Sequence, residues 1–277
     1  MLKTRIITAI VLIAAFIPAL FMLSTVYWAI LMLLITLLAL REWAQMLDFN
    51  SSQIVIYVFI SLAIGVNVIL RLQQNNLHQF FYQSLTIFAF AACFWLLIVP
   101  IWFAKQFKLR GLIAKALLGW ILMLPLLLAI ICAKIVDPKL VLMLLATIWI
   151  ADSAAYFAGK NFGKHKLAPS ISPGKTLEGA AGALIGVTLF GAILYISFGI
   201  HTLAIFPGLW LVTILGVVGD LFESMIKRQM NLKDSGSLLP GHGGILDRID
   251  GVIPSFPIAI MMIYTYNYFI SVANLHA

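Results

Sequence analysis

The residues best suited to chemistry lie between positions 220 and 228, where a long apolar segment gives way to a polar one. If this segment is helical, two carboxylates, a hydroxyl and two cations share about 140° of one face. They are Asp220, Glu223, Ser224, Lys227 and Arg228. Mg²⁺ binds one or two protein carboxylates together with phosphate oxygens, and Lys and Arg neutralise the remaining phosphate charge. This face therefore favours a magnesium-assisted phosphate site over an ordinary helix end whose cations only anchor it at an interface.

A glycine-rich loop follows this face and ends in two more carboxylates. Residues 240–244 read Pro-Gly-His-Gly-Gly, a composition that excludes regular helix and favours close backbone approach. Asp247 and Asp250 lie three residues apart, so in a helical turn they share a side and can converge on a cation held by Asp220. His242 has no His or Cys partner at metal-ligand spacing, so we expect it to brace the turn or to contact a phosphate. The alternative interpretation is a turn-rich loop with solvated charges.

An earlier segment, 172–176, reads Ser-Pro-Gly-Lys-Thr and superficially resembles the end of a P-loop. A P-loop needs glycine where this chain has Pro169, so the motif is absent. A turn that opens onto a helix N-terminus still offers backbone N–H groups to an anion, and Lys175 and Thr176 would add donors. The same residues suit a helix cap, with Thr176 at the N-cap and Glu178 in the first turn. The two roles are compatible.

These residues have to be positioned by an unusually apolar chain. Of its 277 residues, 63% are hydrophobic and 10% are charged, whereas a soluble domain carries roughly 25% charged residues. The composition excludes a water-soluble fold and a disordered chain, and the length allows about eight to ten spans. Cys93 and Cys132 both lie in apolar stretches and resemble neither a disulfide pair nor a zinc site.

Apolar runs between polar breaks predict an all-α polytopic membrane protein with nine transmembrane helices. The expected spans are 6–23, 26–40, 54–70, 81–103, 112–133, 140–158, 177–197, 203–222 and 252–272. We expect a single membrane domain over residues 1–277, in which 1–135 form a hydrophobic scaffold and 136–277 carry the catalytic half. The longer polar loops of that half are 159–176 and 223–251.

The basic residues predict the orientation of these spans. With the N-terminus in the cytoplasm, 15 of the 18 Lys and Arg residues fall on the cytoplasmic side and only Arg71, Lys134 and Lys139 fall outside. Positive charges resist translocation, so this bias supports the span count and a site that faces the cytoplasm from the inner membrane. The net charge of +8 has the same explanation and does not indicate a nucleic-acid partner. The first apolar run exceeds the roughly 7–15 residues of a signal peptide core, so we expect an uncleaved span.

Two aspartates lie at unusual depth in this layout. Asp220 follows the apolar run 209–218, and Asp152 lies inside the predicted sixth span with Tyr156 one turn further on. An ionisable group at such depth in a membrane is energetically expensive and usually functional. Both aspartates therefore join the candidate site.

At these positions the sequence resembles the phosphatidate cytidylyltransferase (CDP-diacylglycerol synthase) family. The 27 residues from Ser224 to Asp250 satisfy every fixed position of the family signature, including its Lys-Arg, Lys-Asp, His-Gly-Gly and Asp-Arg-x-Asp elements. The segment 152–156, Asp-Ser-x-Ala-Tyr, and the segment 172–179, Ser-Pro-x-Lys-Thr-x-Glu-Gly, are also similar to the family. The first half of the chain resembles it only in general character.

The resemblance implies that CTP and phosphatidate, a membrane lipid, react to give CDP-diacylglycerol and pyrophosphate, with Mg²⁺ as cofactor. Asp220 and Asp247 would bind the metal ion, Asp250 would assist, and Lys227 and Arg228 would hold phosphates in the catalytic centre. Positioning and electrostatics suffice, because the attacking oxygen belongs to the lipid phosphate. The other matching positions would bind the substrates. They are Asp152, Ser153, Tyr156, Ser172, Lys175, Thr176, Glu178, Ser224, His242 and Arg248.

Two other functions stay open at this point. A CTP-dependent membrane lipid kinase acting on a polyprenol-type alcohol would share the metal and phosphate groups but release CDP. A secondary transporter would use Asp152 and Asp220 as intramembrane ion sites. Its binding residues should lie near the membrane midplane between internal repeats, whereas the polar residues here gather at one face and no repeat is visible. The sequence leaves the oligomeric state open, with a homodimer among the options.

Overall fold

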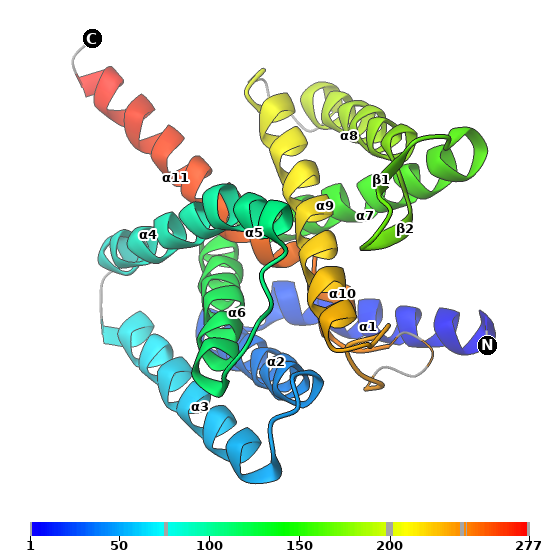
Figure 1. The fold of residues 1–277 in the computed structure, drawn as a ribbon. Coiled ribbons are helices and arrows are strands. Elements are labelled where there is room, and N and C mark those ends of the chain that lie inside the picture. Colours follow the sequence, from blue (N-terminus) through cyan, green and yellow to red (C-terminus); the bar gives the residue numbers. More distant parts are fainter. Residues whose placement is uncertain (1, 75–76, 198–201, 239–240, 242, 276–277) are drawn as a thin grey trace.

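The computed structural model (Figure 1) describes residues 2–74, 77–197, 202–238, 241 and 243–275. Within these ranges the chain is mostly helical. The helices are α1 (Leu2–Met22), α2 (Thr25–Met46), α3 (Ser51–Gln74), α4 (Leu77–Cys93), α5 (Val99–Lys105), α6 (Leu112–Val136), α7 (Pro138–Phe162), α8 (Leu177–Ser197), α9 (Ile205–Gln229), α10 (Leu246–Ile249) and α11 (Val252–Leu275). A π-helical segment, Phe94–Ile98, joins α4 to α5 in one continuous rod.

The helices confirm the prediction of an all-α polytopic membrane protein. Among the described residues, eight helical segments are long and apolar enough to cross a membrane, with α4 and α5 counted as one segment. The apolar part of α1 within the described residues, Ile10–Met22, is shorter. Together with α1, these segments coincide in position with the nine predicted spans. The orientation of the N-terminus stays a prediction.

Several helices extend beyond the predicted spans, α2 and α9 furthest at their C-terminal ends, where the extra turns are polar. α2 continues to Met46 rather than 40, and α9 continues to Gln229 rather than 222. The apolar pattern stops at these points, yet Glu42 on α2 and Glu223 on α9 are buried. Buried charges persist only where other segments supply partners, so the contacts of these side chains explain why the helices continue.

The central helix of the bundle is α6, drawn in green in Figure 1. It contacts α2, α3, α4, α7 and α11. Its buried residues occupy positions all around the helix, as expected for a segment that is apolar on every side. α11 packs against both α6 and α9, so it connects the first half of the chain to the second half.

Lys134 differs from its predicted place in an outer loop, because it is a buried residue in the last turn of α6. Its Nζ donates to the backbone oxygen of Leu23 at 2.6 Å and lies 4.9 Å from the centroid of a Trp28 ring. The ammonium group therefore satisfies a carbonyl just past the end of α1 and makes a cation–π contact with α2. These contacts keep the side chain inside the bundle.

A two-stranded hairpin interrupts the helices between α7 and α8. β1 (Lys166–Ala168) pairs antiparallel with β2 (Ser172–Thr176) across a tight turn. The sequence predicted only a loop over 159–176, because Pro and Gly break every periodic pattern there. β2 ends at Thr176, directly before Leu177, the first residue of α8. The hairpin therefore holds the polar residues 166–176 close to the end of α7 and the start of α8.

Small residues bring α7 and α8 into close contact. A Cβ added at Gly182 would lie 2.3 Å from the Ala158 Cβ, and one added at Gly186 would lie 2.7 Å from the Ala154 Cβ. The two glycines are four residues apart on α8, and the two alanines are four apart on α7. This is the small-xxx-small pattern by which membrane helices approach each other closely.

We expect Gly182→Ala to weaken the contact between α7 and α8, because its Cβ would overlap the Ala158 Cβ. Overpacking of this kind costs about 1–3 kcal/mol, so the purified variant should unfold at a lower temperature in detergent. Gly208→Ala on α9 is the matched control, since nothing lies within 4 Å of its added Cβ. Equal melting temperatures for the two variants would contradict the contact.

Candidate active site

The hairpin and α9 are joined by an ion pair between two residues that the sequence selected separately. Lys175 Nζ in β2 lies 2.6 Å from Asp220 Oδ2 on α9. The second Asp220 oxygen, Oδ1, accepts a hydrogen bond from Ser224 Oγ at 3.2 Å. The Lys175 and Asp220 side chains are 24% and 37% exposed, so solutes can reach this pair.

A second and more deeply buried ion network lies further along α9. Lys227 Nζ lies 2.5 Å from Asp247 Oδ1 and 3.2 Å from Glu223 Oε1. Lys227 and Glu223 are 7% and 5% exposed. Neither Glu223 oxygen has a hydrogen-bond partner within the described part of the chain, so its charge is balanced chiefly by the Lys227 ammonium. Removing one member of such a buried pair leaves an uncompensated charge, which is strongly destabilising.

Asp247, at the start of α10, also binds the backbone before the glycine-rich loop and at its last residue. Its Oδ2 accepts hydrogen bonds from the backbone N–H groups of Ser235 at 3.0 Å and Gly244 at 2.9 Å. Together with the Lys227 contact, these bonds occupy both carboxylate oxygens. Its predicted role as a metal ligand stays a prediction, and in the arrangement described here the side chain organises the loop.

Asp250, between α10 and α11, stands close to α9. It lies within electrostatic range of Asp220 and of the Lys175 ammonium. Gly219 permits this approach, since a Cβ there would lie 2.2 Å from the Asp250 backbone oxygen. Asp152 on α7 is within electrostatic range of Asp220 and Lys175 as well. Asp152, Asp220 and Asp250 therefore all interact electrostatically with Lys175, and Asp220 forms the ion pair with it.

Thr176 caps α8, as one of the two interpretations of the sequence predicted. Its Oγ1 accepts a hydrogen bond from the backbone N–H of Gly179 at 3.1 Å. Glu178, in the first turn, lies 2.6 Å from His165 Nδ1, and it also accepts from the His165 backbone N–H at 3.2 Å. Glu178 therefore fixes the segment that leads into β1. A role of these residues in phosphate binding stays a prediction.

Three further predicted residues lie at the rim of the cluster. Arg228 Nη1 donates to the backbone oxygen of Leu232 at 3.0 Å, which closes the end of α9. Ser153 Oγ donates to a carbonyl one turn earlier in α7. Tyr156 is 62% exposed, with the Lys160 Nζ 5.9 Å from its ring centroid. The sequence predicted that Lys227 and Arg228 share one functional helix face. In the structure Lys227 is buried and Arg228 is exposed, so the two cations point to different surroundings.

The remaining predicted substrate residues have less defined surroundings. Ser172 is half-buried in β2, and Arg248 is exposed on α10 within electrostatic range of Asp152. His242 lies outside the described residues. Their contacts with substrates stay predictions.

Two residues of this region were missed by the sequence reasoning. Glu42, on α2, accepts hydrogen bonds from the glycine-rich loop. His165 binds Glu178. Glu42 is the first acidic residue of the chain and follows a long apolar run, which is the same signal that selected Asp152 and Asp220. No pattern in the sequence indicated His165.

The carboxylates of the cluster are the groups that could hold a metal ion. Within the described ranges, no group of three or more His, Cys, Asp or Glu side chains is close enough to hold one. Mg²⁺ requires less, because it takes one or two carboxylates and completes its shell with phosphate oxygens and water. The solvent-accessible Asp220, with Asp152 and Asp250 within electrostatic range of it, fits that requirement.

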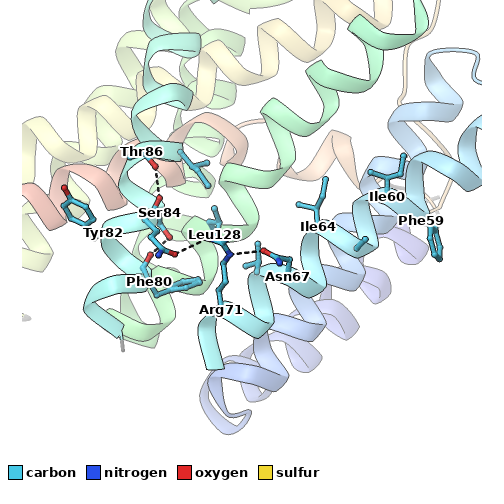
Figure 2. Close-up of a pocket in the computed structure, with 14 residues that line it drawn as sticks. Phe59, Ile60, Ile64, Asn67, Arg71, Phe80, Tyr82, Ser84, Thr86 and Leu128 are labelled. Carbon is cyan, nitrogen blue, oxygen red and sulfur yellow. Dashed lines mark hydrogen bonds between the residues drawn. The ribbon is translucent and has the colours of Figure 1, made fainter. Parts of the chain in front are cut away.

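A separate cavity of about 900 Å³ lies between α3 and α4, and Figure 2 shows its lining. Arg71 faces it and donates from Nε to Asn67 Oδ1 at 2.9 Å. The other lining residues are mainly apolar, and none of the predicted site residues is among them. The charged cluster on α7, β2, α9 and α10 is therefore the candidate active site.

Fold and site together define a polytopic α-helical membrane protein with an acidic, lysine-containing cluster at the ends of its helices. Residues 3–266 match the Cytidylyltransferase family. The phosphatidate cytidylyltransferase of Haemophilus influenzae is 34% identical over 291 residues, which cover 97% of this chain and 99% of that protein. The phosphatidate cytidylyltransferase of Pseudomonas aeruginosa is 33% identical over 273 residues, or 95% and 97% of the two chains. The chain belongs to the cytidylyltransferase family.

We expect Gly219→Ala to lower cytidylyltransferase activity, because its Cβ would push α9 away from Asp250. Displacements of about 1 Å at a reacting centre cost up to about 100-fold in rate, and we expect a loss of at least tenfold. Gly216→Ala is the matched control one turn earlier, where the nearest atom lies 3.8 Å from the added Cβ. Equal turnover by both variants would show that the close approach at Gly219 is dispensable.

Proposed function

We propose that the protein transfers a cytidylyl group from CTP to phosphatidate and releases CDP-diacylglycerol and pyrophosphate. The observation that carries the proposal is the family match over residues 3–266, with relatives of that activity aligned over at least 95% of the chain. The Lys175–Asp220 pair supports it, because it joins the family-like segment 172–179 to α9, the helix in which the Ser224–Asp250 signature begins. Nothing in the structure favours the lipid kinase or the transporter.

The position of the site suits two substrates that arrive from different phases. The cluster lies at the ends of apolar helices, next to the polar hairpin and the glycine-rich loop. A nucleotide can approach from water, and a lipid phosphate can approach from the membrane surface. We place this side in the cytoplasm and the protein in the inner membrane, in agreement with the distribution of basic residues.

The chemistry balances without a protein nucleophile. A phosphate oxygen of phosphatidate attacks the α-phosphorus of CTP, a new P–O bond forms, and the bond to the β-phosphate breaks as pyrophosphate leaves. Lys175 carries three N–H donors, is partly exposed and retains capacity for phosphate oxygens beside Asp220. Lys227 is buried between Asp247 and Glu223 and would have to loosen one of these contacts to reach a phosphate. Ser172, Thr176 and Arg228 would complete the phosphate contacts. Transfer of this kind depends mainly on positioning and charge stabilisation.

A bound Mg²⁺ would neutralise charge on the phosphate oxygens of CTP and of the leaving pyrophosphate. Asp220 is the residue best suited to hold it, because it is accessible and already close to other carboxylates. Asp250, within electrostatic range of Asp220, is a candidate for a second ligand. Asp247 would have to give up hydrogen bonds to the loop before it could serve.

The direct test is an assay with labelled CTP and phosphatidate in reconstituted membranes, following both lipid and nucleotide products. We expect CDP-lipid and pyrophosphate to appear in equal amounts and only when a divalent cation is present. Release of CDP with a phosphorylated lipid alcohol would establish the kinase instead. Substrate uptake without consumption of CTP would establish a transporter.

Two aspartate variants separate metal binding from loop organisation. Asp220→Asn should nearly abolish activity and raise the Mg²⁺ concentration that gives half-maximal rate, because it removes a ligand. If Asp247 mainly organises the loop, Asp247→Asn should lower kcat without changing that Mg²⁺ concentration. The measurement is a Mg²⁺ titration of the rate for each variant. An unchanged titration and full activity in Asp220→Asn would refute its assignment as a ligand.

A further inference from the structure

Glu42 lies far from the catalytic half in the sequence but contacts its glycine-rich loop in space. The side chain is on α2 and is 5% exposed. Its carboxylate accepts a short hydrogen bond from Ser235 Oγ and bonds of 3.0 Å from the backbone N–H groups of Ile245 and Leu246. One side chain therefore binds the residues before the loop and the residues after it.

The loop backbone closes tightly around this carboxylate. A Cβ added at Gly236 would lie 2.8 Å from Glu42 Oε2, and one added at Gly244 would lie 1.9 Å from Oε1. A side chain at either position would displace the Glu42 carboxylate. Gly236 and Gly244 thus form a close-fitting cradle for an acidic side chain.

The end of α2 is a firm support for this contact. Trp43 Nε1 donates to the backbone oxygen of Lys115 at 2.9 Å, and Lys115 Nζ donates to the backbone oxygen of Leu47 at 2.7 Å. These bonds run in both directions between the end of α2 and the start of the central helix α6. Glu42 therefore projects from a part of the bundle that is fixed independently of the loop.

Glu42 and Asp247 divide the loop contacts between them. Asp247 accepts from the backbone N–H groups of Ser235 and Gly244. Glu42 accepts from the Ser235 hydroxyl and from the backbone N–H groups of Ile245 and Leu246. The N–H groups bound by Glu42 lie at the start of α10, the helix that carries Asp247. The orientation of α10 therefore depends on the α2 carboxylate.

We propose that Glu42 is a positioning residue for the reaction: from α2 it fixes Ser235 and the start of α10 and thereby orients Asp247. The inference rests on the proposed function for the identity of the reaction it serves. A carboxylate is required because all three partner groups are donors. Glutamine has only one acceptor oxygen, so it leaves one partner unpaired or facing an NH₂ group.

The first test is amide hydrogen exchange of the full chain in lipid nanodiscs, measured by mass spectrometry. In Glu42→Gln, we expect residues 235–246 to exchange at least about tenfold faster, since local opening becomes easier. α6 and α9 should exchange as in the wild type. Ser235→Ala removes one of the three bonds and should cause a smaller change. Asp48→Asn is the matched control, because Asp48 is an exposed carboxylate at the same end of α2.

The second test is steady-state kinetics with CTP and phosphatidate. Glu42→Gln should lower kcat by about 10- to 100-fold, the range expected when a catalytic group is misplaced. The KM values should change little, because Lys175 and the hairpin do not depend on Glu42. Glu42→Asp retains the acceptor oxygens on a shorter side chain and should recover part of the lost kcat. Asp48→Asn should have wild-type kinetics.

Wild-type kcat in Glu42→Gln, or unchanged exchange of the loop in that variant, would overturn the proposal. Faster exchange spread over α2 and α6 would also overturn it, because Glu42 would then be needed for the fold in general. If the wild-type protein lacks the transfer activity, the proposed function fails. The exchange experiment still decides in that case whether Glu42 holds the loop.

Discussion

The arrangement of α9 and α10 depends on pairing the charged side chains that are buried between them. Lys227 has two carboxylate partners, Asp247 at 2.5 Å and Glu223 at 3.2 Å, and all three side chains are at most 10% exposed. Attraction between opposite charges is much stronger there than in water, but an unpaired buried ion is destabilising by several kcal/mol. α9 and α10 are therefore held together, because moving either one would leave a buried charge unpaired.

Close helix packing makes this charge arrangement possible. Helices in a membrane gain no hydrophobic free energy from associating, so small residues that let backbones approach each other contribute most. Gly219 brings α9 against the Asp250 backbone, and Gly182 brings α8 against α7. The same contacts place the hairpin of Lys175 beside Asp220. Small side chains thus determine how far apart the charges lie, although they carry no charge themselves.

The sequence predicted the helices well because each needs a long apolar run, and it predicted the Thr176 cap because capping is local. The sequence also identified Asp220 and Lys175 as site residues, but it did not predict that they pair. Helical periodicity shows which residues share a face and does not show which distant residues they contact. For the same reason it assigned Lys227 and Arg228 a common role, whereas one is buried against Asp247 and the other binds its own helix end. Partners separated by many residues are fixed only by tertiary packing.

The short helix α10 illustrates how such distant partners act. A helix of four residues is unstable by itself, because nucleation costs more free energy than so few hydrogen bonds return. Its N-terminal N–H groups are instead bound by Glu42, which lies 204 residues earlier than Leu246. The Asp-Arg-x-Asp element therefore has its geometry imposed by the hydrophobic first half of the chain. A segment whose composition resembles a simple scaffold contributes in this way to the shape of the candidate active site.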